Sequence, residues 1–140
     1  MELTRRHLLA IGSSTFALAN LAGLPAFASL TDDAIATLTA GADIGEGGVT
    51  IDAPEIAENG NTVPIGVSAP GAVAITVFAD GNPVPSVATF KFGPLAASQT
   101  ASTRIRLATT QNVVALAEME DGTFQMAKTE VKVTIGGCGG

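Results

Sequence analysis

The last five residues of the chain hold the side chain best suited to chemistry, a thiol between two pairs of glycines. Cys138 is the only cysteine in the chain of 140 residues, and it lies between Gly136-Gly137 and Gly139-Gly140. Because glycine has no side chain and few backbone restrictions, we expect these residues to form a narrow and flexible arm. At about 3.3–3.6 Å per extended residue, Cys138 reaches roughly 10 Å beyond Ile135. A partner that grips the arm must therefore supply the chemistry at the sulfur.

The rest of the chain offers this thiol no catalytic help. The only histidine is His7, which lies in an N-terminal segment that we expect to be removed. A structural zinc site needs about four Cys or His ligands, and a Cys–His nucleophilic pair needs the histidine. An unactivated thiol is only a few per cent thiolate at neutral pH. We therefore expect a non-catalytic protein with no metal or other cofactor.

The N-terminus reads as an export signal. Arg5 and Arg6 precede an apolar stretch that small polar residues interrupt, and Ala26-Phe27-Ala28 supplies a cleavage motif. This pattern predicts a twin-arginine signal peptide over residues 1–28, with an ordinary secretory signal as the alternative. The stretch is a poor match to the roughly 20 apolar residues of a membrane span. We expect a periplasmic protein with no membrane anchor after signal removal.

The charge balance of the mature chain argues against nucleic-acid binding. The signal removes two of the seven basic residues and one of the thirteen acidic ones, which leaves five basic and twelve acidic residues. No basic stripe can form from so few cations. The remaining length of about 112 residues suits a single domain with one core.

The mature chain is expected to begin with a short helix. Thr31 is a suitable N-cap, the residues to Ala40 are mostly apolar and small, and Gly41 is a suitable stop. Residues 42–48 read as a flexible connection, so residues 29–48 are predicted to be helix and linker.

Short strands separated by turn residues follow over residues 49–135. They are centred on residues 49–51, 63–67, 73–77, 87–92, 104–107, 113–118 and 124–135. Pro64 predicts an edge strand or a bulge. Apolar residues change from even to odd positions along the last run, which predicts a bulge or turn near Ala127–Glu130. About seven such strands indicate an all-β, immunoglobulin-like antiparallel β-sandwich, with a small barrel as the alternative. Residues 136–140 extend beyond it.

Three groups of charged residues have both a functional and a structural interpretation. Arg104 and Arg106 suit a partner's acidic groups, but their alternation with Ile105 and Leu107 favours a solvated strand face. Residues 118–121 suit a metal loop less well than an acidic turn, since calcium takes six or more oxygens. A carboxylate pair at residues 55 and 58 is better explained as a loop before an edge strand.

Three interpretations of the tail remain open on the residues alone. Terminal glycines can be incidental. Against this, an exposed unpaired thiol is a hazard in an oxidising compartment. Cys138 can instead anchor an intermolecular disulfide, or it can attach a substrate that moves between enzymes.

The chain resembles the SoxY family of sulfur carriers over essentially all of residues 29–140. The resemblance is carried by Pro54–Gly60, Thr103–Leu107, Gln111–Ala115 and Glu130–Gly140, the last of which ends in the Gly-Gly-Cys-Gly-Gly hallmark. It implies a covalent carrier of sulfur intermediates in thiosulfate oxidation, with Cys138 as the attachment point.

The same resemblance implies a set of partners. They are a SoxZ-like subunit in a heterodimer, a c-type haem enzyme that joins thiosulfate to Cys138, a sulfate-releasing hydrolase and a sulfane dehydrogenase. The alternative function is a structural or assembly module that forms intermolecular disulfides through Cys138, including a tail-to-tail homodimer.

Overall fold

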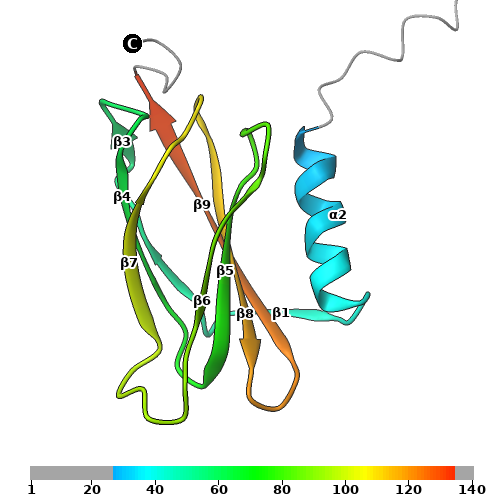
Figure 1. Cartoon of the computed structure of the whole chain (residues 1–140). Helices are drawn as coiled ribbons and strands as arrows, with labels where there is room; N and C mark the ends of the chain where they lie inside the picture. Colours follow the sequence, from blue (N-terminus) through cyan, green and yellow to red (C-terminus); the bar gives the residue numbers. More distant parts are fainter. Residues whose placement is uncertain (1–26, 135–140) are drawn as a thin grey trace, which may run out of the picture.

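The computed structural model describes residues 27–134, in which one helix is followed by nine strands (Figure 1). The helix is α2 (Phe27–Thr39). The strands are β1 (Ile44–Glu46), β2 (Thr50–Asp52), β3 (Ile56–Ala57), β4 (Val63–Ser68), β5 (Ala72–Ala79), β6 (Ser86–Lys91), β7 (Thr100–Ile105), β8 (Gln111–Met119) and β9 (Phe124–Val133). With 13 residues, α2 lacks the length and apolarity of a membrane-spanning helix, and the described range holds no other helix.

The strands form two separate sheets that face each other. The larger sheet has the order β1-β9-β8-β5-β6, with β3 also paired to β9, and the smaller has the order β2-β4-β7. β1 and β3 run parallel to opposite ends of β9, and the other pairings are antiparallel. Two open sheets of this kind make a β-sandwich, so the predicted fold class is confirmed and the barrel alternative is wrong. Nine strands replace the seven expected because β1 and β3 are very short.

The main core lies between the two sheets. On β4, Val63, Ile65 and Val67 are at most 3% exposed, while the residues between them face outward. They pack against inward residues of the larger sheet such as Ile75 and Val77. Burying each such side chain contributes about 1.5–3 kcal/mol, so this alternation holds the sheets together.

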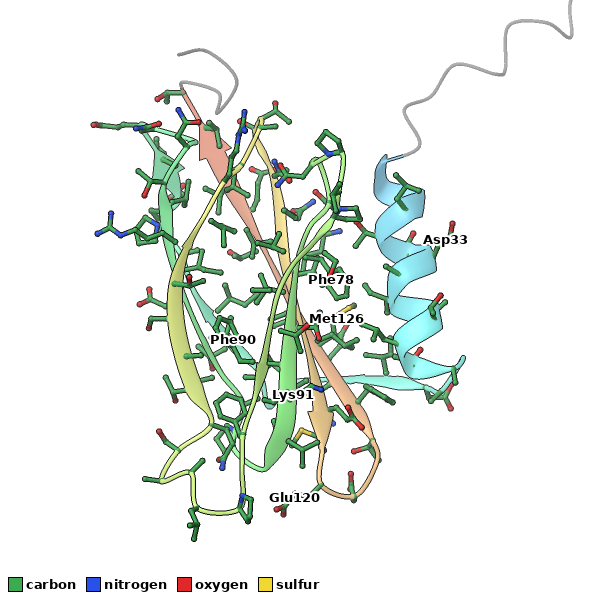
Figure 2. The ribbon with its side chains drawn as sticks, viewed as in Figure 1. Asp33, Phe78, Phe90, Lys91, Glu120 and Met126 are labelled. Atoms are coloured by element: carbon green, nitrogen blue, oxygen red, sulfur yellow. The ribbon has the colours of Figure 1, made fainter. Side chains whose placement is uncertain are left out.

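A second apolar cluster lies on the opposite face of the larger sheet, beneath α2. Phe78 of β5 and Val114 and Leu116 of β8 pack there with Ile35 of the helix. Figure 2 shows Phe78 and Met126 between the sheet and α2. β5 and β8 are therefore buried on both faces, which explains their nearly continuous apolar sequences.

The start of the helix differs from the sequence prediction. α2 is already helical at Phe27, so Thr31 lies inside the helix and the proposed N-cap is wrong. The Thr31 side chain is 3% exposed, and its hydroxyl has no hydrogen-bond partner. The predicted end of the helix at Gly41 agrees with the structure, in which α2 ends at Thr39. Ala40 and Gly41 both have positive φ, and Gly41 N–H donates to Ala36 O at 3.2 Å in a Schellman-type end.

The predicted connection at residues 42–48 contains β1. Ile44 lies against Phe124 in the parallel pairing of β1 with β9, and it also packs in the cluster beneath the helix. The connection is therefore a strand between two turns, since Gly47 and Gly48 follow with positive φ.

The bulge predicted near Ala127–Glu130 is absent, because β9 pairs with β8 in one unbroken register. Phe124 and Met126 pack beneath α2, whereas Val131 lies in the core between the sheets. Both faces of this strand are buried, but at different ends. The apolar residues therefore lie on one face at the start of β9 and on the other face near its end, although the pairing with β8 stays regular.

Pro64 was predicted to mark an edge strand or a bulge, but β4 is the central strand of the smaller sheet. The pairing of β4 with β2 covers only Gly66 to Ser68. Pro64 therefore lies where β4 has β7 as its single paired neighbour, at a local edge that tolerates a residue without an N–H group.

Candidate functional site

The residues singled out for attachment and export lie outside the described range. These are Cys138 with the glycines at 136, 137, 139 and 140, and the arginines at positions 5 and 6. The structure does describe the point from which the tail leaves the domain. We call residues 132–134 the tail base.

Backbone hydrogen bonds to β3 fix one side of the tail base. Lys132 N–H donates to Glu55 O at 2.9 Å, and Thr134 N–H donates to Ala57 O at 3.1 Å. These bonds continue the parallel pairing in which Ile56 lies opposite Lys132. Backbone pairing therefore extends as far as Thr134, the last residue of the described range.

A threonine side chain holds the other side of the tail base. Val133 N–H donates to the Thr110 hydroxyl at 2.9 Å, and that hydroxyl lies 3.5 Å from Val133 O. Thr110 immediately precedes β8, the antiparallel neighbour of β9. Hydrogen bonds thus hold the tail base on both sides, and only three residues lie between Thr134 and Cys138.

The side chains around the tail base carry charges of both signs. Glu55, Glu58 and Lys132 are all exposed. Ile56 is also 55% exposed beside them. The predicted carboxylate pair therefore lies in solvent on either side of β3, with no shared buried proton site.

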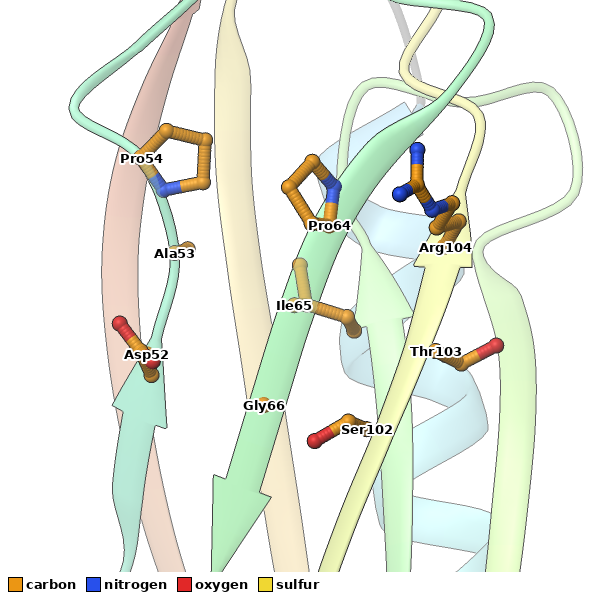
Figure 3. A pocket seen from close by; sticks show the side chains of 9 residues that line it. All are labelled: Asp52, Ala53, Pro54, Pro64, Ile65, Gly66, Ser102, Thr103 and Arg104. Carbon is orange, nitrogen blue, oxygen red and sulfur yellow. The ribbon is translucent and has the colours of Figure 1, made fainter.

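An open groove with a volume of about 640 Å³ runs over the outer face of the smaller sheet (Figure 3). We call it the proline groove. It is lined by Asp52, Ala53, Pro54, Pro64, Ile65, Gly66, Ser102, Thr103 and Arg104. Pro54, Pro64 and Arg104 lie toward one end of the view, and Asp52 and Ser102 toward the other. Gly66, a glycine in the middle of a strand, is the sequence feature that could have indicated this groove. We did not predict a groove from it.

The alternation predicted around Arg104 is confirmed. Ile105 and Leu107 are buried at 4% and 0% exposure, whereas Arg104 and Arg106 are exposed. Among the residues from 27 to 134, Arg104 has no ion pair. Its guanidinium is therefore an available cation at the edge of the proline groove.

The acidic turn near residue 121 is organised by its own hydrogen bonds. The Asp121 carboxylate accepts from the Thr123 hydroxyl at 2.6 Å and from Thr123 N–H at 2.9 Å. Both hydrogen bonds lower the pKa of the Asp121 carboxyl from its ordinary value, and the bond from the Thr123 hydroxyl has the larger effect. Within the described residues no group of three or more His, Cys, Asp or Glu side chains is placed to bind a metal.

Comparison with protein families gives a match to the sulfur oxidation protein SoxY over residues 35–138. The match extends from the helix through the tail cysteine. A comparison with curated protein sequences gives no match.

Solved structures share the fold. The sulfur carrier protein SoxY from Chlorobium limicola f. thiosulfatophilum is 41% identical, with a TM-score of 0.68 over 76% of this chain and 94% of that one. Superoxide reductase (neelaredoxin) from Ignicoccus hospitalis is 19% identical, with a TM-score of 0.55 over 62% of this chain and 80% of that one. A putative superoxide reductase from Thermotoga maritima is also 19% identical, with a TM-score of 0.52 over 66% and 89% of the two chains. The two reductases show a common sandwich and nothing about chemistry.

Proposed function

The chain belongs to the SoxY family of sulfur oxidation proteins, and on that premise we propose that it is a covalent carrier that holds thiosulfate-derived sulfur on Cys138. The observation that carries the proposal is the family match, which ends at Cys138 itself. The structure supports it with a folded domain whose last strand is fixed up to Thr134 and delivers the tail from there.

The carrier cycle balances with Cys138 as the only reacting group of this chain. The thiol and one thiosulfate dianion form a sulfur–sulfur bond, giving a Cys–S–S–SO₃⁻ adduct, one proton and two electrons. A c-type haem enzyme accepts the electrons. A hydrolase then adds water across the bond to the sulfonate sulfur, which leaves a cysteine persulfide and releases hydrogensulfate. A sulfane dehydrogenase then passes six electrons from the outer sulfur to its own electron acceptor, and three waters supply the oxygens, which gives Cys–S–SO₃⁻ and seven protons. A second hydrolysis releases hydrogensulfate and restores the Cys138 thiol.

The folded domain is suited to presenting the tail to partner enzymes. The sequence between the helix and the tail contains neither a cysteine nor a histidine, so the body of the protein supplies no thiol or imidazole. Enzymes act on the adduct because they bring the activating groups, while this chain brings the substrate within their reach.

The test is intact-mass analysis of the protein from thiosulfate-fed cells. Sulfur-containing adducts are expected on the wild type and absent from Cys138→Ser. A matched control places a thiol on the body by combining Cys138→Ser with Ser86→Cys, because Ser86 is exposed on β6. Thiosulfate oxidation should stay lost in that variant, since the thiol is no longer on the arm.

The same experiment separates carriage from assembly. A disulfide module predicts reducible dimers as the only modified species, together with thiosulfate oxidation that survives Cys138→Ser. That combination would refute the carrier proposal and favour the assembly function.

We propose export to the periplasm by the twin-arginine route, directed by Arg5 and Arg6. Replacing both arginines by lysine keeps the positive charge that an ordinary secretory signal needs. The double variant should therefore accumulate in the cytoplasm if the twin-arginine route is used. Unchanged periplasmic amounts in cell fractionation would indicate the ordinary secretory route.

We further propose a heterodimer with a SoxZ-like subunit, which the family resemblance supports. The twin-arginine route exports folded proteins. A chain that needs no cofactor has a reason to use this route if it carries a bound partner that has no export signal of its own. Native mass spectrometry of the exported protein, co-expressed with a SoxZ-family chain, should give a one-to-one complex that resists reduction. A homodimer that separates on reduction would contradict this.

A further inference from the structure

We propose that the loaded tail docks on its own domain, with the sulfonate of the Cys138 adduct on Arg104 in the proline groove. This inference rests on the proposed carrier function and adds a resting site for the anionic adduct. The occupant is the segment of this chain that follows the tail base.

The groove has the form that a thin chain needs. Its floor includes Gly66, where an added Cβ would lie 3.5 Å from Asp52 Cβ and 3.6 Å from Ser102 Oγ. Any side chain at this position would therefore occupy the space between its neighbours. The volume of about 640 Å³ leaves room for a thin segment that carries a single side chain.

The charges favour Arg104 over the lysines of the domain. Lys128 lies 3.8 Å from Asp80, and Lys91 is at the far end of the larger sheet, opposite Ala74. A guanidinium offers paired N–H donors to two oxygens of one anion, and a sulfonate presents such oxygens. Asp52 is at the other end of the groove, which orients the anionic end of the tail toward Arg104.

The nearer cation, Lys132, belongs to a different surface. β9 side chains alternate between faces, and Lys132 shares the face of Phe124 and Met126, which pack beneath α2. Arg104 lies on the outer face of the smaller sheet. The two cations therefore give a matched pair of variants in which only one should affect docking.

The tail is long enough to reach the Pro54 end of the groove, the end at which Pro64 and Arg104 also lie (Figure 3). Thr134 is hydrogen-bonded to Ala57, and Pro54 of the groove precedes Ala57 by only three residues. That places Pro54 no more than about 18 Å from Thr134, from the spacing of consecutive Cα atoms and one hydrogen bond. Four extended residues span about 13–14 Å, and the cysteine side chain with its adduct adds several more. The tail must fold back along β3, which Gly136 and Gly137 permit.

The test compares amide and Arg Nε–H signals of the full mature chain before and after loading. Tetrathionate loads the thiol without an enzyme, because thiolate attack gives Cys–S–S–SO₃⁻ and releases thiosulfate and a proton. Intact mass of the same sample reports loading. In the wild type and in Lys132→Gln, loading should shift the signals of Gly66, Ser102 and Arg104.

Two variants should remove these shifts by different means. Arg104→Gln removes the cation and should reduce the ratio of docked to free tail by up to about fivefold, the range of an exposed ion pair. Gly66→Val fills the floor while keeping the charge. Raising the salt to about 1 M should weaken the wild-type shifts, since it shortens the screening length to about 3 Å.

The outcomes separate docking from carriage. A loaded protein whose shifts are confined to the tail base and beyond would overturn docking and leave the carrier function intact. Equal shifts in Arg104→Gln and wild type would also overturn it. Failure of the thiol to load at all would count against the carrier function and, with it, the docked state.

Discussion

Replacing Phe78 by alanine tests whether α2 is part of the folded domain. Phe78 points to the outer face of β5, away from the core between the sheets, and is 0% exposed only because the helix covers it. In a sandwich of two layers this side chain would face solvent. The variant therefore probes the third layer specifically.

The expected destabilisation is about 3–5 kcal/mol, the range for truncating a fully buried phenylalanine. Ile35→Ala removes the helix side of the same contact, and Ile35 is 9% exposed. We expect about 2–4 kcal/mol for that change. Because the two side chains share one cluster, the double variant should lose less than the sum, by about 0.5–3 kcal/mol.

Urea unfolding followed by circular dichroism suits this protein, because it has no Trp or Tyr for fluorescence. Val84→Ala is the matched control, since Val84 is 72% exposed and should change stability by less than about 0.5 kcal/mol. Tetrathionate loading of Cys138 should be unchanged in native Phe78→Ala, because the tail base lies outside the cluster. A loss below about 1 kcal/mol, or full additivity with Ile35→Ala, would refute the helix contact.

Three further predictions concern the loops and turns. Gln111→Ala should cost about 1–3 kcal/mol in urea unfolding, because the Gln111 side chain accepts from Gly81 N–H at 2.8 Å and the variant leaves that donor without its partner; an unchanged midpoint would show that water replaces it. Gly81→Ala should cost a similar amount, since the new Cβ would lie 2.9 Å from Gln111 Cβ, whereas Gly93→Ala meets nothing within 4 Å and should be nearly neutral. Equal midpoints for these two variants would contradict the clash. Asp121→Asn should remove an acid-dependent contribution: the bonds from Thr123 lower the carboxyl pKa in the folded state, so the wild-type advantage is complete above the ordinary value of 3.8 and disappears as the pH falls through the lower folded value. Urea midpoints of both proteins across this range would show it, and a gap that stays constant into acid would exclude it.

The sequence alone predicted most of the strands and the absence of a second thiol. Cys138 is the single cysteine, and the single histidine is His7, so the sequence between the helix and the tail supplies neither a thiol nor an imidazole. Alternation with Arg104 and Arg106 identified Ile105 and Leu107 correctly as inward residues, since a strand places successive side chains on opposite faces.

Only the tertiary structure decided what covers each apolar face. Phe124, Met126 and Val131 each require burial, and the sequence shows that requirement without showing whether the helix or the smaller sheet meets it. The sequence pattern was interpreted as a strand with a single buried face, and it therefore predicted a bulge that the structure does not contain. The same limit hid the proline groove, because Gly66 and Arg104 are far apart in sequence and meet only when β4 pairs with β7. The hydrophobicity and charge of each residue can be read from the sequence. The surface that each residue packs against or faces depends on contacts between segments that are distant in the sequence.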